Sequence, residues 1–296
     1  MIKTTHISKC YGDVKALDEV TFDVVKGEIF GLIGPDGAGK TSLFRILTTL
    51  MLPDEGQAEV GGYDVVRDYR KIRRSIGYMP GHFSLYQDLT VEENLNFFAS
   101  LFHTTVAENY ALVKDIYVQL EPFKKRKAGK LSGGMKQKLA LCCALIHKPD
   151  VLFLDEPTTG VDPVSRKEFW QMLRNLSDGG LTILVSTPYM DEAAQCDRIA
   201  MMKEGHLMPA GTVEEQRHAY TNQLWSVKGI KMSAILKIFK TFEGALSCYA
   251  FGNELHLATQ GVEKSELETF ARSMHLGEVK ISAIKPSIED CFIALT

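Results

Sequence analysis

The hydrophobic positions of the first 210 residues fall into short apolar runs that alternate with helical patterns. Residues 28–33 have the composition of a strand, and residues 43–51 repeat apolar side chains at helical spacing. Two more apolar runs of strand length occupy residues 151–154 and 181–185. Strands that alternate with helices predict an α/β fold, in which helices cover a parallel sheet.

Two segments depart from this alternation. Residues 90–102 and 110–120 are both helical with no strand between them, which predicts a helical insert at about residues 82–147. Residues 198–202 and 206–210 are apolar runs around a glycine, and they predict a hairpin that closes the sheet.

Beyond Gly211 the pattern predicts a second, smaller domain. Its elements are expected in the order strand, helix, strand, strand, helix, strand, which is the ferredoxin-like α+β arrangement. These elements are residues 224–227, 233–242, 247–251, 254–258, 263–274 and 279–284. The expected domains are therefore residues 1–217 and 218–296, and Ser287 to Asp290 offers capping chemistry for a last short helix.

Composition narrows the classes of protein that remain. The chain has 34 Lys and Arg against 37 Asp and Glu, a net charge of −3 that argues against a nucleic-acid partner. The apolar stretch at residues 140–146 is far shorter than the ~20 residues that span a bilayer, and residues 1–6 lack a signal-peptide core. None of the six cysteines forms a C-x-x-C pair, so we expect a cytoplasmic protein with reduced thiols.

The segment between the first strand and its helix fits the phosphate-loop pattern G-x-x-x-x-G-K-[ST]. Its glycines allow backbone N–H groups to face a polyphosphate, and the following helix adds its positive N-terminal end. Lys40 would reach the β- and γ-phosphates of ATP, and Thr41 would bind Mg²⁺. A merely flexible turn is the alternative, which the flanking strand and helix disfavour. The candidate nucleotide-binding residues here are Gly34, Gly37, Gly39, Lys40, Thr41 and Ser42.

Two carboxylates follow the apolar run at residues 151–154. Asp155 and Glu156 stand at the carboxyl end of this predicted strand, where open α/β sheets bind ligands. Asp155 would hold Mg²⁺ through water, and Glu156 would act as the general base toward the attacking water. Alone, such a pair is more often part of a solvated loop, but the upstream phosphate loop favours the functional interpretation.

A third segment, residues 131–138, predicts a second anion site. Ser132 is a good helix N-cap, and Gly133 and Gly134 leave backbone N–H groups exposed at the start of a helix. By itself, the default interpretation of the segment is an ordinary capped helix.

Together these segments resemble the ATP-binding cassette family over residues 2–215. The phosphate loop, residues 131–135, residues 151–156 and residues 160–162 stand in the family's order and spacing. The resemblance implies a P-loop nucleoside triphosphatase fold with ATP and Mg²⁺ as cofactors. Residues 285–293 are similar to the tail of the drug and antibiotic exporter branch.

The resemblance also implies partners. Two cassettes, identical or different, dimerise head to tail, and each ATP lies between one phosphate loop and the other cassette's residues 131–135. Tyr11 stacks on adenine, and the insert docks on an integral-membrane permease at the inner face of the cell membrane. We expect that contact near Phe83, Leu85 and Tyr86, with packing inside the insert as the alternative. No basic amphipathic helix or lipidation signal is visible, so membrane attachment is expected only through the partner.

Two positions depart from the family pattern. Gly81 stands where the family has a glutamine that senses Mg²⁺ and the attacking water, and Pro188 stands where it has a histidine that contacts the γ-phosphate. Neither residue offers a polar side chain, so hydrolysis at this chain's own phosphate loop is expected to be slow. His82 could substitute, although adjacent loop side chains usually point apart.

The sequence thus predicts the ATP-binding subunit of an exporter, an ATPase that couples ATP to transport by a permease. Alternatives are a soluble non-transport member of the family and a regulatory module that binds ATP with little turnover. The transported substrate is not encoded in these motifs. The C-terminal domain is expected to have a structural or dimer-contact role.

Overall fold

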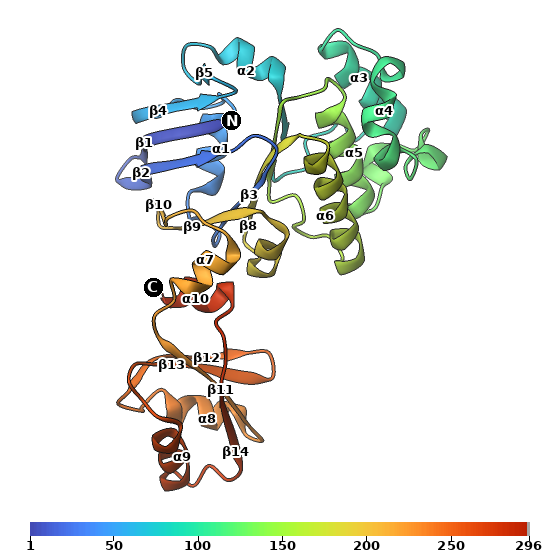
Figure 1. Ribbon diagram of the computed structural model, residues 1–296. Helices are drawn as coiled ribbons and strands as arrows, with labels where there is room; N and C mark the ends of the chain where they lie inside the picture. Colours follow the sequence, from blue (N-terminus) through green and yellow to red (C-terminus); the bar gives the residue numbers. More distant parts are fainter. Residues whose placement is uncertain (295–296) are drawn as a thin grey trace. The chain divides into compact units, whose positions relative to one another are not determined.

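The computed structural model describes residues 1–294 and divides into two units, Met1–Thr212 and Val213–Thr296 (Figure 1). The division falls before the predicted residue 217, because α7 (Val213–His218) packs on α10 (Ile288–Ala294) within the second unit. No helix within residues 1–294 combines the length and the apolar character needed to cross a bilayer.

A six-stranded sheet forms the centre of the first unit, with the strand order β10-β9-β3-β8-β7-β6. All neighbouring strands are parallel except β9 and β10, which form the predicted closing hairpin. The strands are β3 (Ile29–Ile33), β6 (Ile76–Met79), β7 (Val151–Asp155), β8 (Thr182–Thr187), β9 (Arg198–Lys203) and β10 (His206–Leu207). Every residue of β3, β7 and β8 is buried, which explains their continuous apolar runs. The α/β expectation is confirmed.

The order of the central strands places four loops at one edge of the sheet. β3, β8, β7 and β6 are parallel neighbours, so their carboxyl ends lie side by side. The phosphate loop follows β3, Pro188 follows β8, Glu156 follows β7, and Gly81 follows β6 after one further residue.

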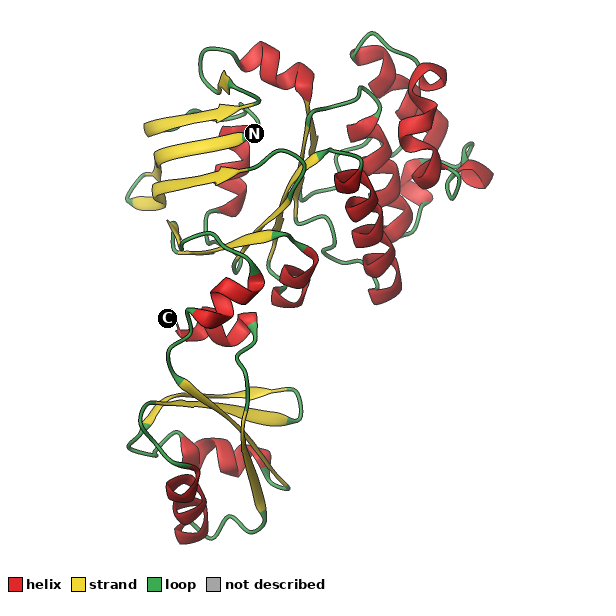
Figure 2. Ribbon diagram, in the orientation of Figure 1, coloured by secondary structure: helices red, strands yellow, loops and turns green. Residues whose placement is uncertain are grey.

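A second sheet, antiparallel and of order β2-β1-β4-β5, was not anticipated from the sequence (Figure 2). Its strands are β1 (Ile2–Tyr11), β2 (Val14–Val24), β4 (Glu55–Val60) and β5 (Tyr63–Asp64). It shares one hydrophobic core with the parallel sheet and with α1 (Lys40–Leu47). Phe44 of α1 meets Phe153 of β7 edge to face in this core, at 6.0 Å between ring centroids.

Helices gather on the other side of the first unit (Figure 1). α3 (Val91–Leu101), α4 (Val106–Tyr117) and α5 (Gly133–Leu145) lie between β6 and β7 in the chain, so the helical insert is confirmed. α6 (Pro163–Asp178) packs beside α5, and α2 (Tyr69–Ser75) precedes β6. Capping boxes begin α3 and α4, where Thr90 pairs with Glu93 and Thr105 with Glu108. Single 3-10 turns are η1 (Glu121–Phe123), η2 (Ala128–Lys130) and η3 (Met190–Gln195).

The second unit has the predicted ferredoxin-like order. Its elements are β11 (Gln223–Gly229), α8 (Met232–Phe239), β12 (Ala245–Phe251), β13 (Glu254–Thr259), α9 (Lys264–Ser273) and β14 (Val279–Ala283). The sheet is antiparallel with strand order β12-β13-β11-β14, and residues of α8 and α9 share its hydrophobic core. Most residues of β11 and β13 are buried, which explains why these strands stand out in the sequence as short, largely apolar runs.

Candidate functional site

The phosphate loop wraps around an open hollow between β3 and α1. Gly39 has a φ of 108° and Gly37 a φ of 81°, which side chains other than glycine rarely adopt. A Cβ atom on Gly39 would lie 2.3 Å from the backbone oxygen of Ala16, so no larger residue fits. The loop, Ser42 and Glu156 line a pocket of about 290 Å³.

Lys40, at the first position of α1, is folded into this loop. Its side chain is 3% exposed, and Nζ donates to the backbone oxygens of Gly34 at 2.8 Å and Pro35 at 2.9 Å. The same Nζ lies 3.2 Å from Oε1 of Glu156. The loop therefore carries a buried cation whose partners are two carbonyls and one carboxylate.

Asp155 ends the buried strand β7 and is 2% exposed. The hydroxyl of Thr41 donates to its Oδ2 at 2.9 Å, and the hydroxyl of Ser186 donates to its Oδ1 at 2.6 Å. A carboxylate beside a hydroxyl is the oxygen donor set that Mg²⁺ prefers, and Mg²⁺ commonly takes its remaining ligands from water and substrate phosphates. No cluster of three or more His, Cys, Asp or Glu ligands exists in the described part of the chain, so the phosphates would have to complete the shell.

Glu156 occupies a left-handed backbone conformation, with a φ of 51°. Its N–H group lies 3.1 Å from the backbone oxygen and 3.0 Å from the hydroxyl of Ser186. Ser186 thus contacts the carboxylate of Asp155 and the backbone of Glu156. No role was predicted for this residue, although a hydroxyl directly after the apolar run at residues 183–185 was an available signal.

Gly81 borders Asp155, and Pro188 follows strand β8, which pairs with β7. A Cβ atom on Gly81 would lie 3.2 Å from the backbone oxygen of Asp155 and 3.9 Å from its Oδ2, so a side chain at position 81 would start beside the carboxylate. Pro188 follows Thr187, whose backbone oxygen accepts from the N–H of Gly34 in the phosphate loop at 3.2 Å. His82 is exposed and makes no hydrogen bond or ion pair within residues 1–294.

Glu192 is a second residue that the sequence analysis did not find. It is 2% exposed and accepts from the hydroxyls of Thr158 at 2.7 Å and Thr187 at 2.6 Å. Its carboxylate therefore ties the turn after Glu156 to the turn that contains Pro188.

Tyr11 approaches the phosphate loop from the antiparallel sheet. Its hydroxyl lies 3.2 Å from Oγ of Ser42 and 3.1 Å from Sδ of Met51, and the residue is 44% exposed. The ring is therefore available at the edge of the nucleotide pocket, on the side of β1.

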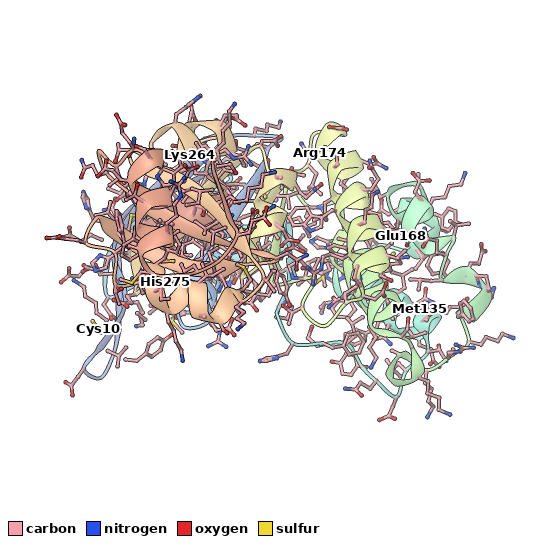
Figure 3. The ribbon with its side chains drawn as sticks, turned by 90° about the horizontal axis from the view of Figure 1, so that it is seen from below. Cys10, Met135, Glu168, Arg174, Lys264 and His275 are labelled. Carbon is pink, nitrogen blue, oxygen red and sulfur yellow. The ribbon has the colours of Figure 1, made fainter. Side chains whose placement is uncertain are left out.

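The segment 132–134 begins α5, and its glycines have a packing role. Ser132 caps the helix by accepting from the N–H of Met135 at 3.4 Å. A Cβ atom on Gly134 would lie 2.8 Å from Oγ of Ser165 in α6, so the two helices approach more closely than a side chain allows. Figure 3 shows Met135 on the side of the first unit opposite Cys10, the neighbour of Tyr11. The chain therefore does not bring residues 132–134 to its own phosphate loop.

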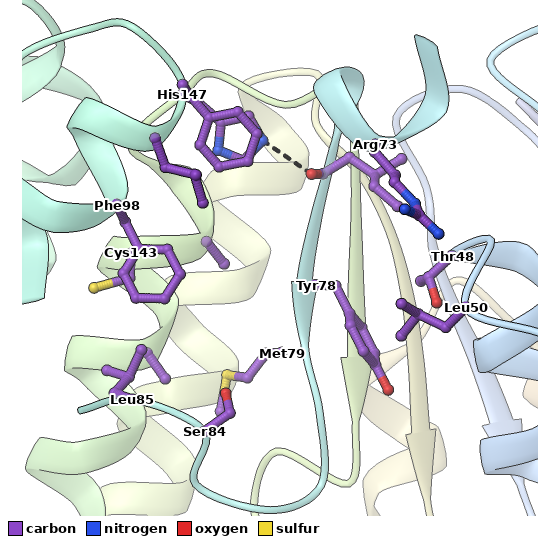
Figure 4. Close-up of a pocket in the computed structure, with 15 residues that line it drawn as sticks. Thr48, Leu50, Arg73, Tyr78, Met79, Ser84, Leu85, Phe98, Cys143 and His147 are labelled. Carbon is purple, nitrogen blue, oxygen red and sulfur yellow. Dashed lines mark hydrogen bonds between the residues drawn. The ribbon is translucent and has the colours of Figure 1, made fainter. Parts of the chain in front are cut away.

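A separate pocket of about 280 Å³ opens between α1, β6 and the helical insert (Figure 4). Its lining is mostly apolar and includes Leu85, Phe98 and Leu101. His147 stacks on Phe102 at 3.7 Å between ring centroids, and burial lowers its pKa below the ordinary 6.5, against the opposing effect of a hydrogen bond to the backbone oxygen of Ile76.

Among the three residues expected at a permease contact, only Leu85 lines this pocket. The exposed Tyr86 packs edge to face on Phe97, with ring centroids 4.9 Å apart. Phe83 lies under Nζ of Lys136, 5.3 Å from its ring centroid, at the first turns of α5.

The fold and the site define a class of protein, an α/β cassette that binds nucleotide through a phosphate loop. Comparison with known families makes this specific, because the model described as ABC transporter matches residues 17–159. The chain belongs to the ATP-binding proteins of ATP-binding cassette transporters, a family of transport ATPases.

Relatives and solved structures support this membership. The chain is similar to the linearmycin resistance ATP-binding protein LnrL of Bacillus subtilis, at 30% identity over 100% of this chain and 98% of that protein. It is 41% identical over 75% of its length to the probable multidrug ABC transporter ATP-binding protein YbhF of Escherichia coli, but it spans only 39% of that relative. The Streptomyces coeruleorubidus daunorubicin resistance protein DrrA3 is 43% identical, and 66% of it is covered. The dimeric bacterial cassette MJ0796 matches 72% of this chain and 98% of its own, at 27% identity and a TM-score of 0.65.

Proposed function

We propose that this chain is the ATP-binding subunit of an exporter, and that it couples ATP binding and hydrolysis to transport by a membrane permease. The observation that carries the proposal is the meeting of the phosphate loop, Asp155 and Glu156 at the carboxyl edge of the parallel sheet, where Thr41 contacts Asp155 and Lys40 contacts Glu156. Its relatives include proteins named for daunorubicin and linearmycin resistance, which supports the drug exporter branch.

Lys40 and the loop N–H groups would hold the phosphates. The Nζ of Lys40 now binds two loop carbonyls and Glu156, and it would turn to the β- and γ-phosphates when ATP fills the pocket. Gly34, Gly37 and Gly39 let the backbone approach, Ser42 adds a hydroxyl, and Tyr11 would stack on the adenine ring.

Thr41 and Asp155 are the proposed Mg²⁺ ligands, the carboxylate acting through water. Their oxygens already lie 2.9 Å apart and fit a hard cation. The bound ion would neutralise charge on the phosphates. Ser186 orients the carboxylate by donating to its other oxygen.

Glu156 is the proposed general base. Because ATP would draw Lys40 away from it, its carboxylate would be released to accept a proton from water. Gly81 and Pro188 offer no side-chain donor beside it, and the exposed His82 makes no contact that replaces them within the described residues. Hydrolysis at this phosphate loop is therefore proposed to be slow.

A second cassette, identical or different, is the first proposed partner. Met135, which follows Gly134, lies across the first unit from Cys10 (Figure 3), and Ser132, Gly133 and Gly134 are proposed to complete a partner's ATP site. A solved cassette with a TM-score of 0.65 is described as a dimer, which supports this arrangement.

The permease is the second proposed partner, and it would place this chain on the inner face of the cell membrane. The apolar pocket of Figure 4 would receive an apolar segment of the permease against Leu85, Phe98 and Leu101. Leu101 is 58% exposed at this pocket, so its side chain is accessible to a partner.

Nucleotide binding tests the proposal directly. Lys40→Ala is expected to abolish binding of Mg-ATP in equilibrium dialysis, whereas Lys130→Ala, an exposed lysine of η2, retains it. Both variants should keep the wild-type circular dichroism spectrum. Unchanged affinity in the folded Lys40→Ala variant would show that the phosphate-loop assignment is wrong.

Permease docking needs a separate measurement. Leu101→Glu should abolish co-purification with the membrane protein encoded beside this one, while Val118→Glu, also exposed but outside the pocket, should not. Equal recovery of the membrane protein with both variants would place the contact elsewhere.

A regulatory module that binds ATP with little turnover is the second candidate, favoured by Gly81 and Pro188. A purified chain that binds ATP and stays inactive after repair of both positions would support it over the transport ATPase.

A further inference from the structure

The segment from β5 through α2 forms an exposed, positively charged surface, here called the α2 surface. Its exposed members are Tyr63, Val66, Arg67, Tyr69, Arg70, Lys71, Arg73 and Arg74. The chain as a whole has a net charge of −3, so this concentration of cations does not reflect its average composition.

Local carboxylates balance only part of this charge. Arg67 pairs with Asp64 at 3.4 Å and Lys71 with Asp68 at 2.9 Å. Arg70 and Arg74 have no carboxylate partner within the described residues, and Arg73 donates to the hydroxyl and carbonyl of Thr49. Three guanidinium groups therefore remain uncompensated.

Apolar and aromatic side chains are interleaved with these cations. Tyr63 and Tyr69 are each 38% exposed, and Val66 is 47% exposed. Lys71 lies 5.0 Å from the ring centroid of Tyr63, and Arg73 lies 5.2 Å from that of Tyr69, so cations and rings form one continuous surface. Arginine, lysine and tyrosine with an exposed aliphatic side chain are the composition of surfaces that lie at a lipid interface.

No basic amphipathic helix was expected from the sequence, and α2 does not contradict that expectation. α2 contains only seven residues, too few to show a helical period. Tyr63 and Val66 precede α2 in the chain and do not belong to the helix. β5 contacts α2, and the ring of Tyr63 lies under Lys71, so these residues extend the basic surface of the helix.

The α2 surface lies next to the pocket that is proposed to receive the permease, which indicates how the surface would face the membrane. Arg73 lines the same pocket as Leu85 and Phe98, and α2 lies at the same end of the first unit as α3 (Figure 1). A permease segment in that pocket would bring α2 toward the bilayer. This orientation rests on the proposed docking of the permease, whereas the composition of the surface does not.

We propose that the α2 surface contacts the headgroups of anionic lipids. Arg70 and Arg74 would bind the headgroup phosphates, and Tyr69 and Val66 would lie at the level of the headgroups. The contact is weak and salt-dependent by itself, and it adds to docking on the permease. A nucleic acid is the less favoured ligand of this surface. The net charge of −3 would repel a polyanion, and the exposed Val66 would gain little from contact with a phosphate backbone.

Flotation of the purified full chain with vesicles tests this contact in the absence of any permease. Phosphatidylcholine vesicles are compared with vesicles of phosphatidylcholine and phosphatidylglycerol at 3:1, in low salt and in high salt. We expect binding only to the anionic vesicles and loss of binding in high salt.

Charge-neutralised variants locate the contact. Each cation near an anionic surface contributes roughly fivefold to partitioning, so Arg70→Gln with Arg74→Gln should weaken binding about 25-fold. Lys124→Gln with Lys125→Gln removes the same charge from an exposed loop after η1 and should change binding less than twofold. Both double variants should keep wild-type ATP binding and melting temperature.

Three results would overturn the proposal. The first is that the wild type does not bind anionic vesicles in low salt, and the second is that the two double variants lose vesicle binding equally. The third is that the chain binds an RNA oligonucleotide through Arg70 and Arg74 but does not bind vesicles. Because no permease is present, none of them bears on the exporter assignment.

Discussion

At the scale of single residues, the site combines an intact charged centre with two missing polar contacts. Lys40 contacts the backbone of the phosphate loop and, at 3.2 Å, the carboxylate of Glu156. Asp155 accepts a hydrogen bond from Thr41. Gly81 borders Asp155 and Pro188 follows the neighbouring strand β8, and neither residue has a side-chain donor. Positioning errors of about 1 Å can cost on the order of a hundredfold in rate, so both positions matter for catalysis.

Restoring both polar side chains should accelerate hydrolysis. We expect Gly81→Gln with Pro188→His to raise the ATPase rate of the purified chain by about tenfold or more. Adding Glu156→Gln to this variant should abolish the gain. The measurement is phosphate release at saturating Mg-ATP.

Gly81→Ala with Pro188→Ala is the matched control. It adds the same Cβ atom at position 81, which would lie 3.2 Å from the backbone oxygen of Asp155, but it adds no polar group. It should leave the rate unchanged. If the wild type turns over at a rate that the repaired variant does not exceed, the proposed weakness of the site is wrong.

At the scale of elements, one close contact holds the start of α5, at residues 132–134, against α6, and another holds α10 against the sheet of the second unit. α5 and α6 approach at Gly134 and Ser165, while α10 is joined to the sheet of the second unit through Asp290. Each contact depends on one residue, so each is open to a direct test.

Gly134→Ala should destabilise the first unit by about 1–3 kcal/mol, because its Cβ would lie 2.8 Å from Oγ and 2.9 Å from Cβ of Ser165. Removing both atoms with Ser165→Gly should recover part of the loss. Gly133→Ala is the control, since its Cβ would meet only the backbone oxygen of Gly160 at 3.4 Å. Urea denaturation measures all of these variants. Equal effects at positions 133 and 134 would contradict the close approach.

Asp290 joins α10 to the sheet. It is 1% exposed and accepts from Nδ1 of His256 at 2.6 Å, from the hydroxyl of Tyr249, and from the N–H of Ser287 at 2.7 Å. The predicted capping chemistry is present here, since the N–H of Asp290 donates to the hydroxyl of Ser287 at 3.2 Å. Burial alone would raise the pKa of Asp290, but the hydrogen bonds from Ser287, Tyr249 and His256 outweigh it and lower the pKa below 3.8.

A folded-state pKa below the unfolded value means that the ionised Asp290 stabilises the second unit at neutral pH. This contribution is present above about pH 3.8 and is lost as the pH falls through the lower folded pKa. Asp290→Ala should cost about 3 kcal/mol at pH 7, because it leaves buried donors unpaired, and much less at low pH.

Trp225 reports on this unit if Trp170→Phe removes the other tryptophan from the full chain. Urea midpoints from its fluorescence at pH 7 and pH 3 would reveal the difference. Glu289→Gln, an exposed carboxylate of the same helix, is the control and should change the midpoint little. An Asp290→Ala effect that does not depend on pH would refute the ionised-carboxylate account.

At the scale of the whole molecule, all proposed nucleotide contacts belong to the first unit. We therefore expect residues 1–212 to bind Mg-ATP within about threefold of the full chain. Complete loss of binding in a folded truncation would show that the second unit takes part in the site.

The proposed dimer-contact role of the second unit needs another measurement, which is ATP-dependent dimerisation followed by light scattering. If the truncation dimerises as well as the full chain, the second unit has no such role.

The sequence by itself determined the elements that local chemistry specifies. The buried strands β3 and β7 appear as continuous apolar runs, and Gly39 and Lys40 appear through their fixed spacing, because a phosphate loop tolerates few residue types. The βαββαβ unit was predictable for a similar reason, since the buried strands β11 and β13 form short, largely apolar runs between turn residues.

Only the tertiary structure decided which of these pieces meet. Strand order placed β6, which precedes Gly81, and β8, which precedes Pro188, on the two sides of β7, and no local pattern encodes the order of strands in a sheet. Ser186 and Glu192 act through hydrogen bonds to residues about 30 positions away, so their roles are invisible in the chain. The antiparallel sheet was missed because irregularities in the pairing of β1 interrupt its alternation of buried and exposed residues, and the α2 surface was missed because a seven-residue helix carries no clear period.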